Sequence, residues 1–141
     1  LSCARVQTLL PETFLKANIF EGLIDSMKLI KKENRVRYEN NPKCIAYEYP
    51  MEDKDINVAF IEIDGRYPNK GCVINESVKE LVFITEGEGK IIIDEEEHKL
   101  EEGDAVLILP KQKYFFDGKL KLVVSCNPSW YPEQHKQVED S

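Results

Sequence analysis

Residues 80–116 read ELVFITEGEGKIIIDEEEHKLEEGDAVLILPKQKYFF, and this stretch decides the fold prediction. Short runs rich in Val, Ile, Leu and Phe alternate in it with Gly, Pro and acidic clusters, which favour chain reversals. Across the chain, the runs that predict strands are 44–49, 57–63, 80–86, 90–94, 105–109, 113–116 and 119–126. The segments between them, including GEG and DGK, are expected to turn. Short strands of this spacing predict one all-β sandwich or barrel.

The composition excludes several classes of protein. The 141 residues are 42% hydrophobic and 32% charged, which suits one soluble domain with a proper core. The formal net charge of −7 argues against a nucleic-acid-binding surface, which needs a basic stripe. No apolar run approaches the roughly 20 residues that span a bilayer, so no membrane partner is expected. The cysteines (Cys3, Cys44, Cys72 and Cys126) lack paired spacing, which favours thiols in a reducing cytoplasm.

The N-terminal residues 1–26 differ from the rest of the chain. Apolar side chains recur there at helical offsets, namely Phe20, Leu23, Ile24 and Met27. This spacing predicts a short helical extension. Met27 also resembles a natural start, so a second hypothesis is that residues 1–26 are a non-native leader. Either way, the barrel domain is expected to span residues 27–141.

The run ELVFITE is apolar on both of its faces. Strand alternation places Val82 and Ile84 on one face with Glu80, and Leu81 and Phe83 on the other. A solvated outer face should be polar. Because a large exposed apolar patch is unusual on a monomer, we expect a second copy of the chain to cover it, giving a homodimer.

The central stretch resembles the cupin superfamily. Its first motif ends in a Glu with a Gly seven residues later, which Glu80 and Gly87 match. Its second motif is Gly-Asp, an apolar strand and a Pro turn, which Gly103, Asp104 and Pro110 match. The resemblance covers about half of the chain. It implies a single-domain cupin barrel, also called a double-stranded β-helix or jelly roll, preceded here by the short helical extension.

The metal-binding motifs of that family are degenerate here. The resemblance implies a metal held by a His-x-His pair, the Glu and a later His. The matching positions hold Val73 and Asn75 (or Ile74 and Glu76 with a shorter gap), Glu80 and Tyr114. A transition-metal site normally needs three or four protein ligands, and only Glu80 remains. We therefore expect no metal cofactor, with a divalent transition metal as the alternative.

The two histidines do not replace the missing ligands. His98 lies in an acidic segment that is expected to be a solvated hairpin turn, and the acidic run 94–97 lacks the spacing of a calcium loop. His135 lies in the C-terminal tail and is expected on the solvent side; the alternative is that the tail folds over the barrel mouth. Trp130 and Tyr131 either cap a pocket or complete the core.

Three candidate site residues remain: Asn75, Glu80 and Tyr114. We predict that they bind a small polar ligand, sugar-like or carboxylate-like, inside the barrel. The alternative is an isomerase or epimerase that works without metal, with Glu80 and Tyr114 as a base and acid pair, or a metal-dependent enzyme. A third interpretation is a buried hydrogen-bond network without chemistry. Turnover that Glu80→Gln abolishes would separate the enzyme from the binding protein.

Overall fold

A computed structural model describes residues 28–139, which form nine strands. The strands are β1 (Val36–Asn41), β2 (Cys44–Tyr49), β3 (Asn57–Tyr67), β4 (Cys72–Asn75), β5 (Lys79–Ile93), β6 (Glu96–Glu101), β7 (Ala105–Ile108), β8 (Tyr114–Asn127) and β9 (His135–Val138). Two 3-10 turns, η2 (Lys32–Asn34) and η3 (Pro132–Gln134), complete the described elements. None of the helical segments in residues 28–139 is long and apolar enough to cross a membrane. The predicted N-terminal helix and the possible start at Met27 lie outside these residues.

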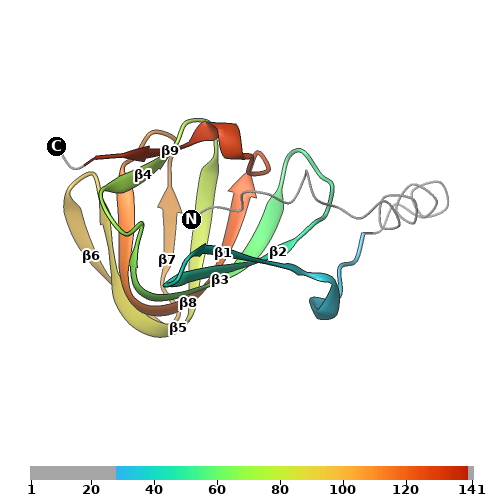
Figure 1. Cartoon of the computed structure of the whole chain (residues 1–141), viewed down its shortest axis with the longest axis horizontal. Coiled ribbons are helices and arrows are strands. Elements are labelled where there is room, and N and C mark those ends of the chain that lie inside the picture. Colours follow the sequence, from blue (N-terminus) through green and yellow to red (C-terminus); the bar gives the residue numbers. More distant parts are fainter. Residues whose placement is uncertain (1–27, 140–141) are drawn as a thin grey trace.

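The strands form one antiparallel sheet that curls around an interior. Its order is β1-β2-β3-β8-β4-β9. Strand β5 pairs with β8 along its whole length, and its other edge pairs first with β7 and then with β6. Figure 1 shows β5 and β8 bending around the bottom of the molecule while β4 and β9 lie across the top. This curled all-β arrangement confirms the barrel prediction.

The glycine-rich segments GEG and DGK do not reverse the chain, so the prediction of separate strands was wrong there. Runs 80–86 and 90–94 belong to β5, and runs 113–116 and 119–126 belong to β8. Gly89 and Gly118 are register partners in the β5–β8 ladder, and a Cβ on Gly118 would collide with the backbone of Gly89. The glycines therefore let two strands approach and bend while their pairing continues.

Alternation along the strands sorts the side chains as expected. On β5, Glu80, Val82 and Ile84 are buried, whereas Leu81 and Phe83 are exposed. The inward residues of β2 are Cys44, Ala46 and Glu48. The inward face therefore carries the hydrophobic core together with a small set of buried polar side chains: Glu48, Asn75, Glu80, Ser129 and Gln134.

The outer face of β5 and β7 carries an exposed apolar patch. Leu81, Phe83, Leu107 and Leu109 are 52%, 47%, 51% and 43% exposed. Leu81 and Leu107 are direct cross-strand partners, so these side chains adjoin one another. We call these four residues the outer patch.

Candidate ligand-binding site

The structure brings the three predicted site residues together inside the barrel. Asn75 ends β4, Glu80 lies near the start of β5 and Tyr114 begins β8. Asn75 Nδ2 donates a hydrogen bond of 2.7 Å to Glu80 Oε1, and the Tyr114 hydroxyl donates a longer one of 3.4 Å to the same oxygen. Glu80 and Tyr114 are fully buried, and Asn75 is nearly so.

A fourth side chain, Gln134, fixes the orientation of this network. Its Oε1 accepts hydrogen bonds from the backbone N–H groups of Ser77 and Val78, in the turn between β4 and β5. Its amide nitrogen must therefore face the other way, and it donates to Asn75 Oδ1 at 2.9 Å. Hence the Asn75 oxygen points to Gln134 and its nitrogen points to Glu80.

His135 belongs to the same network, so its expected place on the solvent side was wrong. It begins β9 and is the register partner of Asn75 in β4. Its Nδ1 lies 2.8 Å from Asn75 Oδ1. Because that oxygen can only accept, Nδ1 carries the proton and donates, which leaves Nε2 with a lone pair. His135 is half-buried, and the physical reason is the pairing of β9 with β4, which draws the tail onto the barrel.

His98, by contrast, is exposed as expected. It lies on β6, after a turn at Asp94 and Glu95. Its imidazole Nε2 is 3.7 Å from the carboxylate of Glu96 on the surface.

Burial perturbs the ionisable groups of this network. It raises the pKa of Glu80, an effect that the hydrogen bonds from Asn75 and Tyr114 offset in part. Burial also raises the pKa of Glu48 to about 8, and the neighbouring charge of Glu80 adds to that effect. Burial lowers the pKa of His135 to about 3, so its imidazole is neutral at physiological pH.

The buried residues do not fit the metal site of a cupin. The amide of Asn75 and the hydroxyl of Tyr114 lie at two of the positions to which the sequence resemblance assigns histidine ligands, and both donate hydrogen bonds to Glu80. Two donors on one carboxylate oxygen stabilise its charge as a cation would. Residues 28–139 also hold no group of three or more His, Cys, Asp or Glu side chains that could bind a metal ion.

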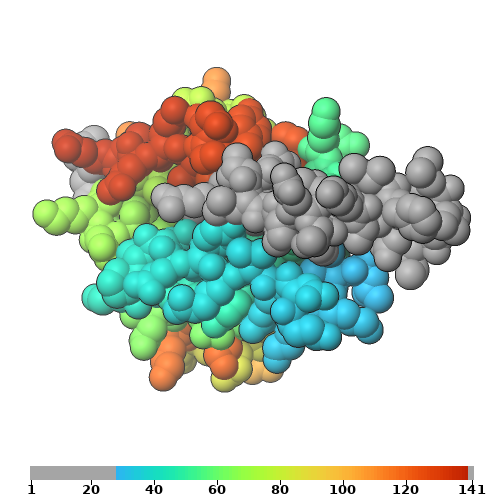
Figure 2. Space-filling view, turned by 45° about the vertical axis from the view of Figure 1, so that its right-hand side comes forward, coloured from blue at the N-terminus to red at the C-terminus, as the bar shows by residue number. Residues whose placement is uncertain are grey.

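A pocket of about 650 Å³ adjoins the network. His135, Trp130 and Tyr67 line it together with Tyr38 on β1 and Lys70 in the loop before β4. Glu80 and Tyr114 are not among its lining residues. In Figure 2 the C-terminal segment, in red, lies above the cyan β1–β2 hairpin. His135 is therefore the residue through which the buried network reaches the pocket.

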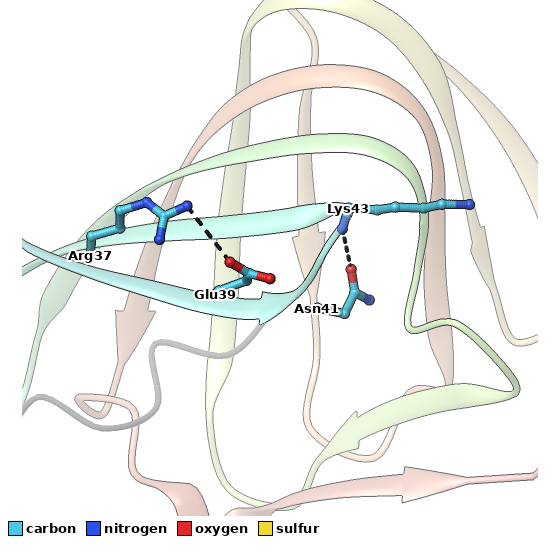
Figure 3. Close-up of polar contacts among 4 residues, drawn as sticks. All are labelled: Arg37, Glu39, Asn41 and Lys43. Carbon is cyan, nitrogen blue, oxygen red and sulfur yellow. Dashed lines mark hydrogen bonds and ion pairs between the residues drawn. The ribbon is translucent and has the colours of Figure 1, made fainter.

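The β1–β2 hairpin forms one wall of the pocket. Asn41 Oδ1 accepts a hydrogen bond of 2.7 Å from the backbone N–H of Lys43, which closes the turn between the strands. Arg37 and Glu39, two residues apart on the same strand face, make an exposed ion pair at 3.8 Å. Figure 3 shows both contacts. The turn contact positions the hairpin, whereas the ion pair lies at the surface and contributes little.

Trp130 also lines the pocket. It is 3% exposed and packs with the hydrophobic core, so it both closes the core and lines the pocket. The preceding Ser129 is tied to the loop before β3, because its backbone N–H donates to the Lys54 carbonyl at 3.0 Å. The backbone N–H of Trp130 donates to Asn57 Oδ1 at 3.3 Å.

Glu48, Gln134 and the pairing of His135 were missed by sequence reasoning. Glu48 lies in the run CIAYEY, where alternation with Cys44 and Ala46 could have indicated an inward carboxylate. Gln134 and His135 follow Pro132 in a tail whose pairing partner no local pattern specifies.

Comparisons with known proteins identify the fold. No family model matches the chain, and no curated protein does. Among solved structures, Pac13 from Streptomyces, described as a nucleoside dehydratase, aligns with a TM-score of 0.74 and 14% identity over 81% of this chain and 92% of its own. Variants of that protein were solved with uridine. The polyketide cyclase RemF from Streptomyces resistomycificus gives 0.65 and 12% over 82% and 87%. An RmlC-like cupin from Shewanella frigidimarina gives 0.62 and 15% over 74% and 93%. The chain therefore has the cupin fold.

Proposed function

We propose that this cupin-fold protein binds a small polar molecule, sugar-like or nucleoside-like, in the pocket beside β9. The observation that carries the proposal is a pocket of about 650 Å³ whose wall includes the half-buried, neutral imidazole of His135. Pockets of this size suit ligands from a monosaccharide to a nucleoside. Structural neighbours act on related molecules, since Pac13 is described as a nucleoside dehydratase and its variants hold uridine.

The residues that line the pocket favour a neutral ligand over a carboxylate, the other ligand class that the sequence analysis predicted. Aromatic rings of Tyr38, Tyr67 and Trp130 offer faces on which a sugar or a base can stack. The charged side chains of Glu39 and Lys70 both line the pocket, and their opposite charges balance. A carboxylate ligand would therefore meet one cation and one anion, and gain little net attraction.

Binding is tested by NMR on isotopically labelled protein with a defined panel: uridine, ribose, glucuronate and citrate. We expect uridine or ribose to shift the resonances of Tyr67, Trp130 and His135, and citrate to leave them in place. Shifts confined to another surface, or no shift with any of the four compounds, would refute the proposed pocket.

An enzymatic function is the second candidate. Two of the structural neighbours are described as a dehydratase and a cyclase. The predicted base and acid pair, Glu80 and Tyr114, is fully buried and absent from the pocket lining, so in this arrangement it orients Asn75 and not a substrate. Loss of turnover in Glu80→Gln, with ligand binding retained, remains the test of a catalytic role.

We also propose that the protein works without the usual cupin metal, because hydrogen bonds from Asn75 and Tyr114 already stabilise the only remaining ligand residue, Glu80. Elemental analysis of protein purified without chelators is expected to show less than stoichiometric Fe, Mn, Ni, Cu or Zn. A stoichiometric amount of one of them that dialysis against EDTA removes, together with uridine or ribose binding, would overturn this proposal.

The outer patch supports a homodimer. Four adjoining apolar side chains on β5 and its neighbours (Leu81, Phe83, Leu107 and Leu109) are half exposed on a chain of net charge −7. A second copy offers the same apolar surface, so two such faces bury each other in an isologous contact. The scattered cysteines support the cytoplasmic location.

A further inference from the structure

Two neighbouring rings among the residues that line the pocket, Trp130 and His135, carry a hydrogen-bond donor and an acceptor. The rings of Trp130 and His135 have centroids 5.4 Å apart and planes tilted by 52°. Trp130 Nε1 and His135 Nε2 are both buried, and neither has a hydrogen-bond partner among residues 28–139. We call these two atoms the Trp–His pair. Buried polar atoms without partners are rare in folded proteins, so the pair calls for an explanation.

The chemical role of each atom is fixed. An indole N–H can only donate. His135 Nε2 can only accept, because the proton of the neutral ring is held on Nδ1 by its contact with Asn75 Oδ1. That oxygen is itself oriented by Gln134, whose amide is anchored by two backbone N–H groups. The two rings therefore carry one donor and one acceptor without partners among residues 28–139, in a tautomer that the buried network specifies.

We propose that the Trp–His pair recognises a lactam edge, that is, a ring N–H beside a ring C=O, as in uracil. The ligand carbonyl would accept from Trp130 Nε1 and the ligand N–H would donate to His135 Nε2. Hydrogen bonds of about 3 Å allow one such edge to reach both neighbouring rings. This inference rests on the proposed function, since it names the chemical class of the ligand in the same pocket.

Other ligand chemistries match the pair less well. A carboxylate can accept from Trp130, but it sets a lone pair against the lone pair of His135 Nε2. An ammonium group can donate to His135 Nε2, but it sets its own N–H against the N–H of Trp130, and neither of these two groups can accept. A sugar hydroxyl can satisfy either atom, but it does not use the flat aromatic surfaces of Tyr38 and Tyr67 that line the same pocket. A planar ring with a lactam edge uses both the aromatic surfaces and the polar pair.

The decisive comparison changes the ligand and leaves the protein intact. Uridine and 3-methyluridine differ at the ring N–H, which a methyl group replaces. We expect 3-methyluridine to bind about tenfold to a hundredfold more weakly than uridine by isothermal titration calorimetry, because it leaves His135 Nε2 without a donor. Equal affinities for the two nucleosides would overturn the lactam inference.

Two variants assign the effect to the two atoms. His135→Ala is expected to bring the affinities for uridine and 3-methyluridine together. Trp130→Phe keeps an aromatic ring but loses the N–H, so uridine binding should fall about tenfold while the ratio between the two nucleosides persists. His98→Gln, which changes the exposed histidine, is the matched control and should alter neither value. If the ratio of the affinities for uridine and 3-methyluridine is unchanged in His135→Ala, another group accepts the hydrogen bond from the ring N–H.

The remaining outcomes separate this inference from the proposed function. If ribose binds in the pocket and uridine gains nothing over it, the pocket binds sugars and the lactam inference is wrong. If none of uridine, ribose, glucuronate and citrate binds, both the inference and the proposed function fail. Nitrogen-15 NMR provides a check that needs no variant: a proton on His135 Nε2 in the unliganded protein contradicts the assigned acceptor.

Discussion

The pH dependence of stability should be controlled in large part by the buried carboxyl group of Glu48. This side chain is 1% exposed on the inward face of β2, and its Oε1 has no hydrogen-bond partner within the described part of the chain. Burial raises its pKa from 4.5 to about 8, with a further contribution from the charge of Glu80. The folded state therefore binds a proton that the unfolded state releases at moderate pH.

The sign and size of the effect follow from linkage. A carboxyl group with a raised pKa imposes no penalty below the unfolded pKa of 4.5, and its penalty grows until pH reaches about 8. At about 1.4 kcal/mol per pH unit, the interval from 4.5 to about 8 corresponds to roughly 5 kcal/mol lost from the free energy of unfolding. Relaxation around the charge would reduce this value, so it is an upper bound. The loss falls between about pH 5 and pH 8.

Glu48→Gln removes the ionisation and keeps the shape of the side chain. We expect the free energy of unfolding, measured by urea denaturation from about pH 5 to pH 8, to fall less steeply in this variant than in the parent chain. Glu62→Gln, on the neighbouring strand and partly exposed, is the control and should follow the parent curve. Parallel curves for the parent chain and Glu48→Gln would refute the argument that Glu48 is buried and protonated.

Three further changes probe the fold and the assembly. Gly118→Ala should lower the free energy of unfolding by at least about 2 kcal/mol, because its Cβ would collide with the backbone of β5; Gly103→Ala, with open space around its Cβ, should cost less in the same urea assay. Leu81→Glu should convert the proposed dimer to a monomer in sedimentation velocity, whereas the equivalent change at Leu29, an exposed leucine outside the strands, should not; a monomeric parent chain would contradict the dimer. Tyr114→Phe removes the buried hydroxyl that donates to Glu80 and should lower the free energy of unfolding by about 1–3 kcal/mol; an unchanged value would show that this hydroxyl contributes nothing to stability.

Much of the fold could be predicted from the sequence because strand alternation and turn chemistry are local signals. The inward set of Glu80, Val82 and Ile84 follows directly from a two-residue period, and the structure confirms it. The glycines led to wrong strand boundaries in the sequence prediction, since a Gly that permits a turn also permits close approach between strands. Gly89 and Gly118 serve the second purpose, which becomes visible only when the two strands are paired.

The site was only partly predictable, for a related reason. Asn75, Glu80 and Tyr114 could be placed together because the spacing of the cupin motifs brings those positions to one interior. His135 could not, because its burial depends on the pairing of β9 with β4, a contact between segments about sixty residues apart. The tail carries no sequence pattern that specifies its partner. A histidine in a polar tail therefore looks like a surface residue until the strand pairing is known.

Asn75 links the buried carboxyl group of Glu80 to the pocket residue His135, and this link is itself testable. Its amide nitrogen donates a hydrogen bond to Glu80. Its oxygen accepts one from His135 Nδ1, which keeps the proton of the neutral ring on that nitrogen. Asn75→Asp keeps the shape but places a second carboxyl group 2.8 Å from the imidazole, where a negative charge favours the imidazolium form.

We expect the pKa of His135 to rise in Asn75→Asp from its present value of about 3, which nitrogen-15 NMR titration measures directly. Once Nε2 is protonated it becomes a donor, so the preference for uridine over 3-methyluridine should disappear as the pH falls through the new pKa. His98→Gln, which changes the exposed histidine, should leave that preference unchanged. If Asn75→Asp keeps both the low pKa and the preference, the amide does not set the tautomer. The contact of Asn75 with Glu80 would then have no connection with ligand recognition.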